Sequence, residues 1–339
     1  MTNPEKVLIT AGHEVGGLTA FAEGLSEGFT ALSIPSEVIS PKEIFKRWRD
    51  LRDAKVLKIL STTAVFAAPV ARRAICVAHG FPRADAQGWT RMLAILGSFR
   101  LANAYSGAQL VAVSDYGAIH LQTIFNLRID AVIRNPLRSI FLQRPDVSDQ
   151  NRCYVTYVGR LNPAKNLHRI LPSICDLLDE TPGLRVCIIG DGEQRAALER
   201  CVNGNPRVEF KGTQDPHSVR ELLRHTKAFV SGTPTEGLGI TYLEALSQGC
   251  AVAMPASGGG LEVALDQIGR SVHLLPLSLD RKEVTAVLHR ALDSTISAVS
   301  LSAYEAKAVA MAYLRVDSRF SLIGKFAGYK IHRVKDEIA

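Results

Sequence analysis

The hydrophobic positions along the chain follow two alternating patterns. Short runs rich in apolar and β-branched residues alternate with segments of about ten to fifteen residues in which apolar positions recur at helical spacing. This alternation is typical of parallel sheets whose faces are covered by helices. In the first half, the runs predict strands within residues 6–12, 31–40, 55–62, 74–80, 109–115 and 130–135. In the second half, they predict strands within residues 153–159, 185–192, 207–212, 227–232, 250–255 and 271–276.

The pattern predicts two doubly wound α/β domains. Prolines and polar residues interrupt the periodicity over residues 135–152, and a fresh strand follows, so we place the joint there. The predicted domains are residues 1–140 and 141–317. A length of 339 residues with 47% hydrophobic residues is consistent with two buried cores.

Composition and charge narrow the class of protein. The six cysteines form no C-x-x-C pair and have no histidine at metal-ligand spacing, which predicts free, mostly buried thiols in a reducing cytosol. The N-terminus does not resemble a signal peptide, and the longest uncharged apolar stretch is too short to span a bilayer. We therefore expect a cytoplasmic protein, at most peripheral to a membrane. The net charge of +7 favours an anionic partner.

Ligands of open α/β sheets bind at the carboxyl ends of the strands. Gly16 and Gly17 follow the first predicted strand at the start of a helix, where bare backbone can approach a phosphate, although a simple glycine-rich turn would look the same. Arg160 follows the strand at 153–159, and Lys165 precedes the next helix. The two cations form either an anion site or a pair of solvated surface charges.

Two glutamates lie in the stretch TPTEGLGITYLEALSQG, residues 233–249. Glu236 falls in the predicted turn and Glu244 on the predicted helix, with seven residues between them. Backbone N–H groups around Leu238 would face an anion at the helix start. Alternatively, Glu236 caps the helix and Glu244 lies on a solvated face, although its apolar neighbours indicate that it needs a polar partner.

Together, the E-x7-E pair, Arg160, Lys165 and the stretch IGDGEQRAALE resemble the donor domain of retaining GT-B glycosyltransferases of group 4 type. The resemblance implies a GT-B fold, with two Rossmann-like domains facing across a cleft and a C-terminal helix, residues 318–339, packing back on the first domain. It is strongest from about residue 154 to 265. The chain departs from the family at Arg138, where an aspartate is common, and at Leu238, where an aromatic residue is frequent.

The family's residue roles carry over by position. Arg160 and Lys165 match the pair that binds the nucleotide diphosphate, Glu236 the carboxylate on the sugar hydroxyls, and Glu244 the one on the ribose. His79 matches a residue on the acceptor side of the cleft, although a lone histidine after a strand is more often structural. The remaining implied donor-binding positions are Gly16, Gly17, Gly190, Gly237, Leu238 and Gly239.

The predicted function is transfer of a hexose-type sugar, with retained configuration, from a UDP- or GDP-linked donor to a saccharide or lipid-linked acceptor. Lipopolysaccharide, exopolysaccharide or glycolipid synthesis would use this reaction. No D-x-D triplet is present, so we expect a metal-independent enzyme without a cofactor. A GT-B nucleotide-sugar epimerase and a non-catalytic sugar-nucleotide-binding protein are the alternatives. A nucleic acid partner is not expected, because the basic residues are dispersed.

A basic segment, residues 42–58, suggests a second partner. It carries seven basic and three acidic residues, with Ile44, Trp48 and Leu51 at helical spacing. Such a segment either docks on an anionic membrane surface or packs its apolar stripe on its own sheet.

Overall fold

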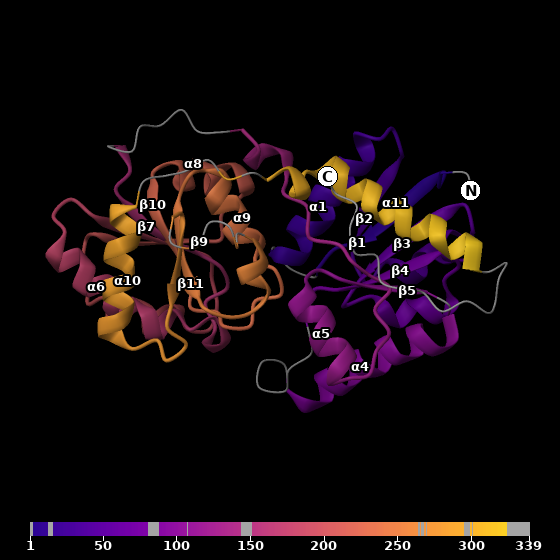
Figure 1. The fold of residues 1–339 in the computed structure, drawn as a ribbon, viewed down its shortest axis with the longest axis horizontal. Helices are drawn as coiled ribbons and strands as arrows, with labels where there is room; N and C mark the ends of the chain where they lie inside the picture. Colours follow the sequence, from indigo (N-terminus) through magenta and orange to yellow (C-terminus); the bar gives the residue numbers. More distant parts are fainter. Residues whose placement is uncertain are drawn as a thin grey trace.

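The protein contains two parallel six-stranded sheets, each enclosed by helices (Figure 1). The fold is seen in a computed structural model that describes residues 3–12, 16–80, 88–106, 108–143, 151–263, 265, 268, 270–294, 299 and 301–323. This arrangement confirms the predicted α/β class. Each of the twelve apolar runs identified in the sequence overlaps one strand of the two sheets.

The first sheet has the strand order β2-β1-β3-β4-β5-β6. Its strands are β1 (Lys6–Thr10), β2 (Ser36–Ile39), β3 (Val56–Ser61), β4 (Ala74–Ala78), β5 (Gln109–Ala112) and β6 (Ala131–Val132). Its helices are α1 (Gly17–Thr30), α2 (Trp48–Arg52), α4 (Trp89–Leu101), α5 (Asp115–Thr123) and α11 (Ala306–Ile323), with shorter turns η1 (Ile44–Arg47), η2 (Val65–Val70) and the π-helical η3 (Ala102–Ser106).

Strand alternation divides the apolar residues of this sheet between two cores. In β1, Val7 and Ile9 belong to the core that also contains residues of α1 and α11, whereas Leu8 belongs to the core beneath η2 and α4. Both faces are buried, which explains why the strands read as nearly continuous apolar runs.

The second sheet has the order β12-β11-β10-β7-β8-β9. Its strands are β7 (Tyr154–Val158), β8 (Arg185–Ile189), β9 (Val208–Gly212), β10 (Thr226–Val230), β11 (Ala251–Pro255) and β12 (Val272–Leu275). The covering helices are α6 (Leu167–Glu180), α7 (Arg195–Cys201), α8 (Pro216–Arg224), α9 (Ile240–Ser247) and α10 (Arg281–Asp293), with 3-10 turns η6 (Pro163–Lys165), η7 (Gly259–Val263) and η9 (Ser302–Tyr304).

The strand order fixes where a ligand can bind. From β7 the chain builds outward through β8 and β9, then returns to β10 on the other side of β7 and builds outward again. The loops after β7 and β10 therefore diverge at a topological switch point, the place where open parallel sheets bind ligands. In the first sheet, the corresponding point lies between β1 and β3.

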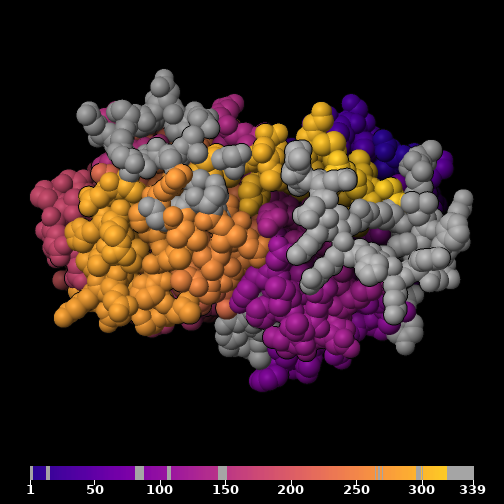
Figure 2. Space-filling model, in the orientation of Figure 1, coloured from indigo at the N-terminus to yellow at the C-terminus, as the bar shows by residue number. Residues whose placement is uncertain are grey.

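The two domains share a core and are linked by the joint and by α11. One cluster of buried residues extends from α1 and α11 through Leu137 and Phe141 of the joint to Leu223 of α8 and Leu243 of α9. Figure 2 shows α11, in yellow, lying over indigo and purple segments of the first domain. The Arg73 guanidinium pairs with Asp317 of α11 at 2.6 Å, which fastens this helix to the first domain.

The last helix begins earlier than the sequence suggested. It starts at Ala306 rather than at residue 318, and its described part ends at Ile323. Its first turns pack on α1 of the first domain, where a Cβ on Gly28 would lie 2.1 Å from the Ala306 carbonyl oxygen, a tertiary contact that local sequence does not reveal. Residues 324–339 of the predicted helix lie outside the described residues.

The basic segment is not a single helix. It forms η1 and the short α2, and β3 begins at Val56. Ile44 and Leu51 are buried against the sheet, as packing on its own sheet requires, but Trp48 is 50% exposed and Phe45 is 52% exposed. Among the cysteines, Cys76, Cys187 and Cys250 are buried, whereas Cys201 is exposed, which corrects the expectation for that residue.

Candidate functional site

The loop after β7 brings Arg160 and Lys165 to the switch point. The Asn162 side chain accepts a hydrogen bond from the Lys165 N–H at 3.2 Å, which fixes the η6 turn. Asn166 then adopts a left-handed conformation (φ 53°) where α6 begins. Its Nδ2 donates to the Gly232 carbonyl at 3.0 Å, so the loop is tied to the one after β10.

Lys165 meets Glu236 across this switch point. Lys165 Nζ lies 2.7 Å from Glu236 Oε2, and the two side chains are 30% and 26% exposed. Arg160 is exposed nearby, and its carbonyl accepts a hydrogen bond from the Tyr157 hydroxyl at 3.0 Å. Burial, with a smaller contribution from the Glu236 charge, raises the pKa of Tyr157, which therefore stays a neutral donor. A cation and a carboxylate, Lys165 and Glu236, thus lie together at the carboxyl edge of the sheet.

The turn that carries Glu236 is shaped by three glycines. A Cβ on Gly237 would lie 2.1 Å from the His79 carbonyl oxygen, so this turn touches the loop after β4 of the first domain. Gly239 (φ 80°) lies against the ring of Tyr242 and begins α9 without a side-chain cap. Glu236 is therefore not the cap of α9. The Gly259 N–H donates to the Glu236 carbonyl at 2.8 Å, which holds the turn from the far side.

Glu244 lies buried on α9, and the solvated helix face considered for it in the sequence is wrong. The polar partner expected for it is Arg138 of the joint, whose Nη2 donates to Glu244 Oε1 at 2.7 Å. Desolvation raises the pKa of Glu244, and the Arg138 charge opposes that rise. Sequence reasoning marked Arg138 as a departure from the family but did not connect it with Glu244.

His79 sits where the two domains touch. Its ring packs edge-on against Phe21 of α1 at 4.4 Å, and its Nε2 is buried with no hydrogen-bond partner among the described residues. Desolvation lowers the pKa of His79 to about 3, so the imidazole is neutral. The residue is partly exposed as a whole, and its carbonyl borders Gly237.

Of the other predicted site residues, Gly16 and Gly17 are exposed to solvent, whereas Gly190 and Leu238 pack closely against other residues. Gly16 and Gly17 are exposed at the start of α1, and a Cβ on either would meet no described atom within 4 Å. In contrast, a Cβ on Gly190 (φ 126°) would lie 2.0 Å from the Gly159 carbonyl oxygen, so this glycine allows the turns after β7 and β8 to pack together. The Leu238 side chain is buried in the core. Its backbone alone is left to face a ligand.

Sequence reasoning missed Glu262. This residue belongs to the second domain, yet its carboxylate accepts hydrogen bonds from the Asp115 N–H at 2.9 Å and the Tyr116 N–H at 2.7 Å, at the start of α5 in the first domain. The only signal in the sequence was the glycine run before it, SGGGLE, which brings the backbone close to Ser114 and Gly237.

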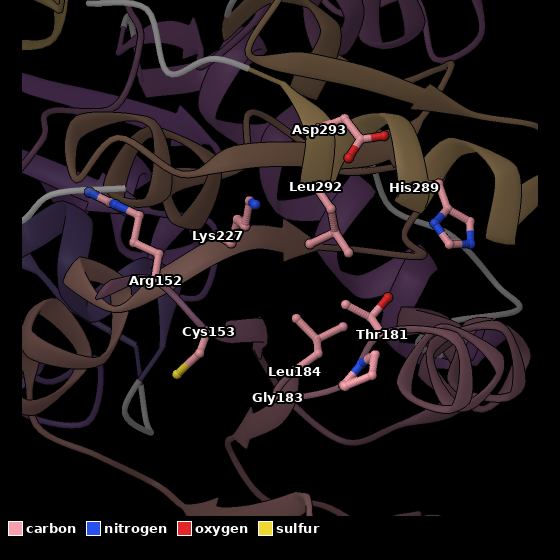
Figure 3. Close-up of a pocket in the computed structure, with 10 residues that line it drawn as sticks. Arg152, Cys153, Thr181, Gly183, Leu184, Lys227, His289, Leu292 and Asp293 are labelled. Carbon is pink, nitrogen blue, oxygen red and sulfur yellow. The ribbon is translucent and has the colours of Figure 1, made fainter. Parts of the chain in front are cut away.

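A pocket lies at the opposite edge of the second sheet (Figure 3). It is lined by Cys153 before β7, Leu184 before β8, Lys227 early in β10, and His289 and Asp293 of α10. These positions mark the amino ends of the strands, away from Lys165 and Glu236. The described residues contain no group of three or more His, Cys, Asp or Glu side chains placed to hold a metal ion.

Comparison with known proteins matches this domain to a family. Residues 141–274 match the family model of group 1 glycosyl transferases. The sulfoquinovosyl transferase SQD2 of Arabidopsis thaliana is 31% identical over 155 residues, which are 45% of this chain and 29% of that protein. A GDP-mannose-dependent α-(1-6)-phosphatidylinositol dimannoside mannosyltransferase of Mycobacterium tuberculosis is 30% identical over 134 residues, 39% of this chain and 35% of that protein. The chain thus matches about a third of the length of these relatives.

The whole fold also has solved counterparts. The structure of Anabaena Alr3699/HepE in complex with UDP and glucose aligns with a TM-score of 0.70 at 16% identity, covering 95% of this chain and 99% of that one. The fold is therefore GT-B, and its second domain carries the sequence pattern of group 1 glycosyl transferases.

Proposed function

We propose that the protein is a retaining, metal-independent glycosyltransferase that moves a hexose-type sugar from a UDP- or GDP-linked donor to an acceptor hydroxyl. The observation that carries the proposal is the convergence of Lys165 and Glu236 at the switch point, 2.7 Å apart, against the His79 loop of the other domain. A cationic group for phosphate and a carboxylate for hydroxyls meet where parallel sheets bind nucleotides.

The chemistry follows from these groups. As the bond between the sugar and the diphosphate lengthens, negative charge grows on the leaving phosphate. The cations of Lys165 and Arg160 and the uncapped N–H groups at the start of α9 would stabilise that charge in place of a metal ion. Glu236 would then exchange its contact with Lys165 for hydroxyls of the sugar and orient the sugar without attacking it.

We place His79 on the acceptor side of the reaction. Gly237 packs against the His79 carbonyl, and in the proposed enzyme this domain contact would exclude water that otherwise hydrolyses the donor. The bare backbone of Gly16 and Gly17 would approach the donor phosphates from the first domain.

The proposal is tested by screening UDP- and GDP-linked hexoses for thermal stabilisation and then following the fate of the bound donor. At 100 times its dissociation constant, a ligand adds about 2.7 kcal/mol to the free energy of unfolding. We expect one donor to stabilise the protein and to yield nucleoside diphosphate with an acceptor saccharide or glycolipid. Release of an epimerised sugar nucleotide without acceptor, or binding without turnover, would contradict the assignment.

The acceptor proposed is a lipid-linked saccharide presented at an anionic membrane surface. The exposed Phe45 and Trp48 support it, because the Phe45 ring lies 5.5 Å from that of Phe66 and the Arg52 guanidinium lies 5.9 Å from the Trp48 ring. Aromatic rings with cations beside them suit an interface with anionic lipid. The described helices include none long and apolar enough to cross a bilayer.

Liposome flotation tests this partner. We expect the wild type to float with vesicles of phosphatidylglycerol and phosphatidylcholine, and a variant with Lys46, Arg49 and Arg52 changed to Glu to remain at the bottom. A control variant with Arg200, Lys282 and Arg290 changed to Glu alters the net charge equally at exposed positions of the second domain. Equal flotation of all three proteins would rule out this docking surface.

A further inference from the structure

Arg138 connects three separate segments of the chain. It lies in the joint directly before η4 (Ser139–Phe141). Its Nη2 donates to Glu244 Oε1 of α9 at 2.7 Å, and its Nη1 donates to Glu23 Oε2 of α1 at 3.1 Å. The guanidinium also lies 5.3 Å from the centre of the Phe141 ring, which fixes its plane. One cation thus joins the joint, the first domain and the second domain.

Burial raises the pKa of the Glu244 carboxyl, and the charge and hydrogen bond of Arg138 offset part of that rise. The Glu244 side chain is only 4% exposed, so burial alone would favour the protonated acid. Glu23 on α1 adds a second negative charge, and Glu27 on the same helix faces the joint by accepting from the Ser139 N–H. Among the described contacts of Glu244, Arg138 supplies the positive charge that balances these carboxylates.

Glu244 and Arg138 each keep a polar atom that has no hydrogen-bond partner among the described residues. Arg138 occupies Glu244 Oε1, and no described residue donates a hydrogen bond to Oε2. Arg138 Nε is buried without a hydrogen-bond partner among the described residues. A buried, unsatisfied polar atom in a folded protein calls for an explanation. The remaining carboxylate oxygen of Glu244 can accept a hydrogen bond from a ligand hydroxyl.

We propose that Arg138 is a positioning residue for nucleotide recognition: it holds the Glu244 carboxylate so that Oε2 accepts a hydrogen bond from the ribose hydroxyls of the donor. The inference rests on the proposed function, because it requires a nucleotide donor. It adds that the joint between the domains, through Arg138, sets the affinity for the ribose.

The test compares nucleotides with and without ribose hydroxyls. Isothermal titration calorimetry measures the affinity of the wild type for UDP and for GDP. The affinity for the 2′,3′-dideoxy analogue of the tighter-binding nucleotide is measured next. The variants are Arg138→Met, which keeps the length of the stem without charge, Arg138→Lys, which restores a cation, and Glu23→Gln, which removes the second partner of Arg138. Each is measured at pH 6, 7 and 8, with its thermal midpoint recorded.

We expect the wild type to bind the dideoxy analogue about 10- to 100-fold more weakly, the range for one charge-assisted hydrogen bond. Arg138→Met should bind the full nucleotide as weakly as the wild type binds the analogue, and should lose affinity further as the pH falls and Glu244 is protonated. Arg138→Lys should recover part of the affinity and a flat pH profile. Glu23→Gln should resemble the wild type.

Nucleotide binding and ribose recognition are tested by different measurements. If the wild type binds neither UDP nor GDP, the proposed function is wrong. If it binds the full nucleotide and the dideoxy analogue equally well, Glu244 does not recognise ribose and the role of Arg138 is overturned, while the proposed function stands. Should Arg138→Met fail to fold, Arg138→Lys still decides, because a purely structural role predicts that this variant keeps the wild-type ratio between the affinities for the two nucleotides.

Discussion

At the scale of single residues, the ion pair of Lys165 and Glu236 is suited to exchange. Both side chains are about a quarter to a third exposed, and exposed ion pairs stabilise a fold by only about 0 to 1 kcal/mol. A diphosphate carries more charge than one carboxylate, so it can take Lys165 without unfolding the loop. The pair holds both groups ready while the donor is absent.

Replacing Lys165 by Met should therefore lower turnover about 100- to 1000-fold, as the loss of one preorganised donor to a transition state does. The thermal midpoint should change little. Steady-state kinetics with the donor found by screening measures the first, and calorimetry the second. Lys211→Met is the matched control, because Lys211 also pairs with a glutamate, Glu209, but on β9 away from the switch point. Equal turnover in the two variants would remove Lys165 from the mechanism.

The buried His79 imidazole should make the free energy of unfolding depend on pH. Its pKa in the folded protein is about 3, below the ordinary 6.5, so between these values the unfolded chain binds a proton that the folded chain does not. The free energy of unfolding should therefore fall as the pH drops below 6.5, by at most about 1.4 kcal/mol per pH unit. Urea denaturation of the wild type and of His79→Asn from pH 7 to 5 measures the difference. Parallel curves would show that the imidazole is solvated.

At the scale of elements, α1 and α11 pack through a glycine. A Cβ on Gly28 would lie 2.1 Å from the carbonyl oxygen of Ala306 at the start of α11. The helices can approach this closely because no side chain separates them, and Phe21 and Tyr313 then fill the space beyond.

Gly28→Ala should lower the free energy of unfolding by about 1 to 3 kcal/mol, the usual effect of overpacking. Gly97→Ala is the control: it lies in α4, where a Cβ meets no described atom within 4 Å, and should raise stability by about 0.5 to 1 kcal/mol. The two tryptophans, Trp48 and Trp89, both lie in the first domain, so their fluorescence during urea denaturation reports this unfolding. A neutral Gly28→Ala would show that the helices can move apart.

The observed strands and helices also show which parts of the fold could be predicted from the sequence. Twelve strands followed from local apolar runs, because strands buried on both faces need apolar side chains at nearly every position. The packing of the first turns of α11 on the first domain did not follow, because it depends on tertiary contacts of α11 with Gly28 and Arg73. Likewise, the E-x7-E spacing pointed to Glu236 and Glu244, but the contacts of Arg138 and Glu262 join residues 106 and 147 positions apart. Local patterns carry no information on such pairs.

At the scale of the whole molecule, Glu262 links the two domains at the start of α5. Ser114 is the N-cap of this helix, and Glu262 adds a second cap from the other domain by accepting from the next two N–H groups. Opening the interface would expose the N–H groups of Asp115 and Tyr116. The arrangement of the domains is thereby coupled to the stability of one helix.

Glu262→Ala should loosen this interface and raise the radius of gyration measured by small-angle X-ray scattering in the absence of nucleotide. Loss of the cap should lower stability by about 0.5 to 2 kcal/mol. Asp280→Ala removes a carboxylate that also accepts from two N–H groups at a helix start, on α10 within the second domain, and should cost similar stability without changing the radius. If both variants scatter like the wild type, Glu262 does not hold the domains together.

The position of α11 has a consequence for biosynthesis. This helix covers α1 and is fastened to Arg73, but the ribosome adds it only after every strand of the second domain has been made. The second domain is thus an insertion within the first, and it can finish folding during translation. The nascent first domain has to wait with the apolar face of α1 uncovered, which makes it the stage of synthesis at which a chaperone would be needed.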